Sequence, residues 1–143
     1  MTEGDALRAI AAAVEAGWSE SLVIFPAQTS TPPDSDPYVI VAWRGLANGG
    51  STHGRPGERQ VHRRALVIAQ VYEPTDPDSD GDSALPALDR AARFRALFDG
   101  LSLPDTPGAE AVTFIDAVTT PIGQYGAHYQ VNVTLTCTYP ATF

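Results

Sequence analysis

The chain has 143 residues, of which 43% are hydrophobic and 18% charged, as expected for one globular domain, residues 1–143, with a single core. The net charge of −8 argues against non-specific nucleic-acid binding, and the absence of lysine excludes Schiff-base and P-loop chemistry. The single cysteine, Cys137, excludes an internal disulfide, and no apolar run is long enough to cross a membrane. The acidic N-terminus does not resemble a signal peptide, so we expect an intracellularly made protein.

Two helices are predicted from apolar residues at helical spacing. The first covers residues 5–16 and ends at Gly17, and Thr2 and Asp5 have the spacing of a capping box. The second starts after Ser83, carries its apolar stripe from Leu88 to Phe98, and ends at Gly100.

Strands are predicted where β-branched and aromatic residues gather between loops rich in Pro, Gly and Asp. They cover residues 22–25, 38–44, 59–72, 111–118 and 127–139. In the long strand at 59–72 only the second half is apolar enough for a core, so we expect the first half to project into solvent or onto a partner. The last strand alternates strictly between apolar and uncharged polar residues, which predicts one buried and one wet face.

This order of elements predicts an α+β fold. Because the helices and strands are segregated rather than alternating, we expect an antiparallel or mixed sheet of about five strands with both helices packed on one face.

Catalytic signatures are missing from the sequence. It contains no G-x-S-x-G, H-E-x-x-H or C-x-x-C motif, its three histidines lie on different predicted elements, and Cys137 falls on the apolar side of its strand. We therefore expect no enzyme and no cofactor.

One acidic loop has the beginning of a calcium-binding pattern. Asp76, Asp78 and Asp80 alternate and Gly81 follows, but Ala87 stands where a closing Glu is required. The loop is a weak metal candidate, and a solvated acidic approach to the second helix is the alternative interpretation.

A basic cluster is the most prominent feature of the predicted surface. It groups residues of the long strand and its preceding loop with an arginine from the strand paired to it: Arg44, Arg55, Arg59, His62, Arg63 and Arg64. In an acidic chain, such a cluster predicts a docking surface for an acidic patch on another copy or a partner, with a solvated face and a DNA contact as alternatives.

The order of features resembles the tail terminator (tail completion) family of long-tailed bacteriophages, over nearly the whole chain. The resemblance is carried by a short amphipathic helix, a Pro-rich loop leading to Tyr38-Val39-Ile40-Val41, and a long strand that ends in Val67-Ile68-Ala69-Gln70-Val71-Tyr72-Glu73-Pro74. It continues with a helix ending in Phe94-Arg95-Ala96-Leu97-Phe98 and closes on the alternating strand Tyr129 to Tyr139.

Membership would imply a virion protein at the tail–neck junction, assembled in the host cytoplasm. It would form a homo-oligomeric ring, usually hexameric, that caps the tail tube protein, ends tube polymerisation and meets the head–tail connector or stopper protein. DNA would pass through the ring without specific binding. From the sequence itself, the polar side of the last strand, with His128, Gln130, Asn132 and Thr134, is the candidate channel-facing or partner-facing surface. The alternatives are another neck component, or a calcium- or small-ligand-binding module.

Overall fold

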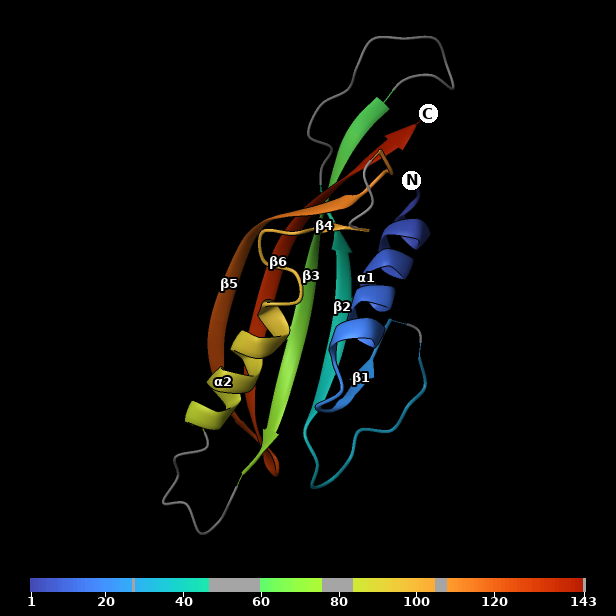
Figure 1. The fold of residues 1–143 in the computed structure, drawn as a ribbon. Coiled ribbons are helices and arrows are strands. Elements are labelled where there is room, and N and C mark those ends of the chain that lie inside the picture. The colour runs from blue at the N-terminus through green and yellow to red at the C-terminus, as the bar shows by residue number, and fades with distance from the viewer. Residues whose placement is uncertain (27, 47–59, 76–83, 105–107, 143) are drawn as a thin grey trace.

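The computed structural model describes residues 1–26, 28–46, 60–75, 84–104 and 108–142. In these residues the chain forms two helices and one mixed sheet, which confirms the predicted α+β class (Figure 1). The helices are α1 (Glu3–Gly17) and α2 (Ala84–Arg95). The strands are β1 (Leu22–Ile24), β2 (Tyr38–Gly45), β3 (Gln60–Pro74), β4 (Ser102–Leu103), β5 (Val112–Tyr125) and β6 (His128–Thr142).

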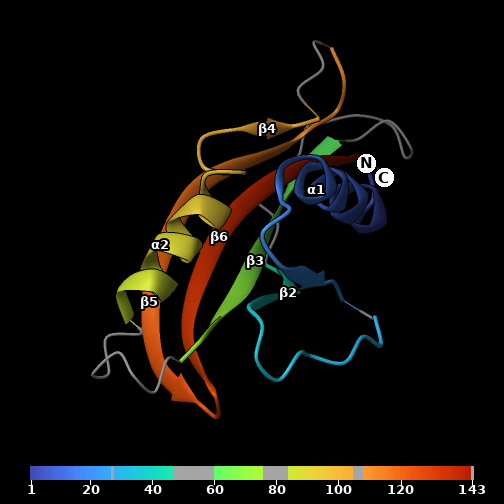
Figure 2. The same cartoon turned by 60° about the horizontal axis from the view of Figure 1, so that its bottom comes forward.

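The sheet has the order β1-β2-β3-β6-β5-β4. β1 pairs in parallel with β2, and every other neighbouring pair is antiparallel. β3 and β6 form the centre and pair along their full length, from Gln60 with Thr142 to Pro74 with His128. Figure 2 shows the sheet as strongly curved, with the two helices over it.

Both helices pack on the same face of this sheet, as predicted. The alternating positions Val67, Ala69, Val133 and Leu135 are buried there, in one core with Ile10 of α1 and other helical residues. The opposite face, which we call the open face, carries the intervening positions and is covered by neither helix.

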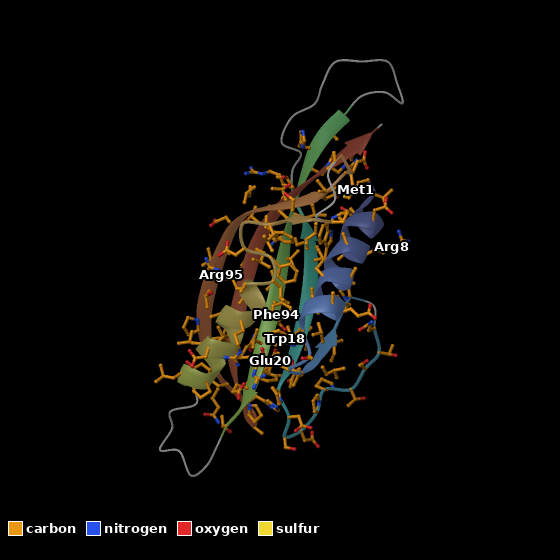
Figure 3. All side chains as sticks on the ribbon, in the orientation of Figure 1. Met1, Arg8, Trp18, Glu20, Phe94 and Arg95 are labelled. Carbon is orange, nitrogen blue, oxygen red and sulfur yellow. The ribbon has the colours of Figure 1, made fainter. Side chains whose placement is uncertain are left out.

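The helices contact each other at their aromatic residues. Trp18 follows α1 and packs edge-on against Phe94 of α2, with ring centroids 5.1 Å apart (Figure 3). Gly17 lies close to Leu97, since a Cβ at that position would lie 2.8 Å from Cδ2 at the end of the Leu97 side chain, which would have to shift. The capping box predicted for α1 forms: Thr2 Oγ1 accepts from the Asp5 amide at 3.1 Å, and Asp5 Oδ2 accepts from the Thr2 amide at 2.9 Å.

Some predicted bounds were wrong. The sheet has six strands rather than about five, because the two-residue β4 has too little pattern to be recognised in the sequence. β5 was expected to end at residue 118 but continues through Pro121 and Gly123 to Tyr125, and α2 ends at Arg95, well before Gly100. The predicted N-cap Ser83 lies outside the described residues.

The first part of β3 extends beyond the neighbouring strands, but only one of its faces is open as the sequence predicted: His62 is exposed, whereas Val61 is 2% exposed and belongs to the buried side. Within the described strands, β2 ends opposite Ala65 and the β5 pairing begins at Thr138, so residues 61–63 pair only with residues 139–141 of β6. This two-stranded extension places the side chain of His62 outside the main body of the sheet, and Arg64 lies where the extension begins.

Candidate assembly surface

The open face is organised in rows of side chains that cross β2, β3, β6 and β5. Three adjacent rows carry no charged residue. They are Tyr38–Tyr72–Gln130–Gly123, Ile40–Gln70–Asn132–Thr120 and Ala42–Ile68–Thr134–Val118. The surface is therefore a neutral platform of aliphatic, amide and hydroxyl side chains within an acidic chain.

An aromatic cluster closes one end of this platform. Tyr38 and Tyr72 stack with ring centroids 4.4 Å apart, and His128 meets Tyr38 edge-on at 5.0 Å. A ring nitrogen of His128, Nε2, lies 2.9 Å from the carbonyl oxygen of Asp36. Tyr125 extends the cluster to the edge of the sheet, where 63% of its surface is exposed.

Two residues of the predicted wet face are in fact buried. His128 is 5% exposed beneath the aromatic rings, and Gln130 is 9% exposed and donates from Nε2 to Asn132 Oδ1 at 2.9 Å. The expectation of a uniformly wet row was wrong for these two, because the neighbouring tyrosines cover them. Asn132 and Thr134 remain half-buried and reach the surface.

Burial raises the pKa values of two tyrosines in this cluster. It raises the pKa of Tyr72 to about 12, with a smaller contribution from the nearby Tyr38, and it raises the pKa of Tyr38 as well. The hydroxyl of Tyr72 donates to Gln70 Oε1 at 3.2 Å. A phenol with the ordinary pKa of about 10 is already neutral at physiological pH, and burial extends the neutral range of Tyr38 and Tyr72 to higher pH.

The basic cluster predicted from the sequence is divided by the pleat of β3. Arg44, His62 and Arg64 are exposed on the open face, and Arg44 and Arg64 lie diagonally across β2 and β3, since Arg44 pairs with Leu66. Arg63 points to the helix face, opposite Tyr139 of β6. Arg55 and Arg59 lie outside the described residues.

In the described part of the chain, no three His, Cys, Asp or Glu side chains come together in a way that could hold a metal ion. The candidate loop of Asp76, Asp78 and Asp80 lies outside the described residues.

Cys137 is fully buried, and burial raises the pKa of its thiol to about 12, so it is a core residue rather than a nucleophile. No described helix is long and apolar enough to span a membrane.

A hollow with a volume of about 640 Å³ lies between α1 and β4. Its walls are mainly alanines of α1 with Leu103 and Pro104, and its polar groups are already engaged: the Met1 ammonium lies 2.7 Å from Glu110 Oε2. The hollow has no free convergent polar groups of the kind that orient a small ligand.

The outer edge of β5 was missed by sequence reasoning. Ile115, Val118 and Ile122 are each about half exposed there, and Asp116 is exposed between them. The residues after Val118 do not alternate between apolar and polar, and Pro121 and Gly123 are unusual within a strand, so no signal in the sequence indicated the second half of β5.

Comparison with known proteins establishes the fold alone. No family model matches the chain, and no curated protein matches it. A solved structure with 20% sequence identity is similar over 93% of this chain and 94% of its own, with a TM-score of 0.62. At this identity the likeness shows that the whole chain adopts a fold already observed, and it carries no function.

Proposed function

We propose that this chain is a structural virion protein that forms a ring at the head-proximal end of a phage tail tube. The ring would cap the tube, end its polymerisation and offer a surface to the head–tail connector. No catalysis and no cofactor are part of this proposal, and its partners are other copies of the chain, the tube protein and the connector.

The observation that carries the proposal is the open face of the sheet. One side of the sheet packs against the helices in the core, whereas the other presents three rows of uncharged side chains across four strands. Ile68 is half-buried and Val118 is exposed, so part of their apolar surface contacts water in the monomer. Contact with another subunit would remove this surface from water. A neutral surface in a protein of net charge −8 is also suited to a channel wall along which DNA moves without adhering.

The shape of the sheet supports assembly in a second way. β3, β5 and β6 are far longer than typical strands, and the ends of β3 and β6 extend beyond both neighbouring strands. The exposed Arg44, His62 and Arg64 lie at this end, where they are placed to meet an acidic surface.

Deletion of the gene from the phage that encodes the chain tests the proposal. We expect tails of uncontrolled length that do not join heads, visible by negative-stain electron microscopy, and rescue by the gene supplied in trans. Tails of normal length and undiminished infectivity would contradict the proposed function. Normal tail length with a failure to join heads would instead indicate another neck component, such as a connector or stopper.

A further inference from the structure

The sheet has two edges that are only partly paired in the described residues. At one edge β1 pairs with Tyr38–Ile40 and leaves Val41–Gly45 of β2 without a strand on its outer side. At the other edge β4 pairs with Val112 and Thr113, and β5 has no outer strand from Ile115 onward. Figure 2 shows the short β4 beside β5 and the short β1 on the opposite side of the sheet. Unpaired N–H and C=O groups along a strand are a template for pairing with another strand.

The edge of β5 is also unusually apolar. Four of the eight exposed large hydrophobic side chains in the described part of the chain lie on β5: Ile115, Val118, Ile122 and Tyr125. Edges that must stay unpaired are normally protected by several charges, by proline or by bulges. β5 has Pro121 and two register shifts, and these confine the regular unpaired stretch to Asp116–Thr120. This stretch has the same length as the unpaired stretch Val41–Gly45 of β2.

The direction of the two edges makes them compatible with each other. β2, β3, β6 and β5 are successively antiparallel, so β2 and β5 run in opposite directions. A second copy in the same orientation therefore presents its β2 antiparallel to the β5 of the first copy. The two sheets would continue as one, with their open faces on the same side.

Charges are complementary when the rows of the open face continue from one copy into the next. One row of the open face runs from Arg44 through Leu66 and Thr136 to Asp116, so it has a cation at one edge and a carboxylate at the other. When the rows are continued from copy to copy, Asp116 faces Arg44 of the next copy, and Val118 faces Ala42. Opposite charges and apolar groups placed directly across two strands stabilise the pairing.

We propose that copies of this chain join head to tail by pairing Asp116–Thr119 of β5 with Val41–Arg44 of β2 in the next copy. This inference rests on the proposed ring and identifies the contact that would build it. The two edges that meet belong to different strands, so the interface is heterologous. A heterologous interface builds a closed ring when the rotation from one copy to the next is a whole fraction of a full turn. Each added copy buries the exposed side chain of Val118 and supplies the outer β2 edge with a strand.

The test is a charge exchange between the two edges. Asp116→Arg and Arg44→Asp are made singly and together, and rings are followed by light scattering and by titration onto tail tubes. Each single variant places like charges at every junction, and we expect the concentration for half-maximal ring formation to rise at least about tenfold. The double variant restores the pairing and should assemble close to the wild-type concentration.

An equimolar mixture of the two single variants gives a stricter result. At every second junction the cation introduced by Asp116→Arg would meet the carboxylate introduced by Arg44→Asp. At the junctions between them the unchanged Asp116 and Arg44 would meet, so the mixture should form rings with alternating subunits. Asp89→Arg, an equal charge change on the exposed side of α2, is the matched control and should assemble normally. Unchanged melting temperatures would confirm that the variants are folded.

The outcomes separate the two proposals. Single variants that assemble like the wild type would overturn the edge pairing while leaving the ring intact. Loss of rings in the single variants without recovery in the double variant or the mixture would overturn the register. If the wild-type protein itself forms no ring, even on tail tubes, the proposed function is wrong.

Discussion

Tyr72 illustrates how one residue combines packing with protonation. Its ring stacks on Tyr38 beneath Tyr125, and burial raises the pKa of its hydroxyl to about 12, above the ordinary value of about 10. Between these two values the unfolded chain loses the proton while the folded chain keeps it. The stabilisation is therefore complete below about pH 10 and is lost as the pH rises toward 12.

We expect the urea midpoint of the wild-type protein to fall steadily between about pH 10 and 12. Tyr72→Phe removes the titrating group, so the fall should become shallower, although loss of the hydrogen bond to Gln70 should cost about 1 kcal/mol at pH 7. Urea titrations of both proteins across this range check the prediction. An equally steep fall in the variant would show that other groups, such as the Cys137 thiol, dominate the alkaline transition.

At the scale of the elements, α2 is anchored by charge as well as by its apolar stripe. Arg90 pairs with Glu73 of β3 and, at 3.3 Å, with Glu20, whereas Arg93 pairs with Glu20 at 2.9 Å. The two arginines differ in exposure, at 15% for Arg90 and 51% for Arg93. Figure 3 shows Glu20 lying toward α2, between the two parts of the helical layer.

Removal of each arginine should separate these contributions. Arg90→Ala leaves the half-buried Glu73 without its partner and should lower the free energy of unfolding by about 2 to 3 kcal/mol. Arg93→Ala should cost no more than about 1 kcal/mol, since its pair with Glu20 is largely exposed. Denaturant unfolding of the two variants gives the comparison, and equal losses would contradict the dependence on burial.

The elements also show what the sequence can and cannot predict. The α1 helix and β6 were recognisable because each repeats its apolar residues with one period, and β2 and β3 because β-branched and aromatic residues gather in them. The second half of β5 and the short β4 were not, since their stability comes from pairing with a neighbour rather than from their own residues. The alternation of a strand places Arg63 and Arg64 on opposite faces, but only the packing of the helices shows that Arg63 lies on the helix face and Arg64 on the open face.

On the scale of the whole molecule, the two faces of the sheet have separate roles. One face packs against the helices and maintains the fold, and the other is the face that we propose for assembly. Arg63 and Arg64 are neighbours in the chain that belong to these different faces, so they offer a direct test of the separation.

We expect Arg64→Glu to weaken ring formation without lowering the melting temperature, because Arg64 is exposed on the open face. Arg63→Glu should instead lower stability by about 1 to 2 kcal/mol, since it places a carboxylate beside Tyr139, where Glu3 also contributes negative charge. Thermal unfolding and light scattering on both variants distinguish the two roles. A lowered melting temperature for Arg64→Glu would assign that residue to the fold.

The central position of β6 has a consequence for synthesis of the chain. β6 is made after every other strand, yet it is the strand that joins β3 to β5. On the ribosome the sheet stays in two halves until residues 128–142 emerge, and closure then requires contacts between segments far apart in sequence. High contact order of this kind slows folding. The nascent chain therefore presents its strand edges to chaperones, or to other nascent copies, for most of its time on the ribosome.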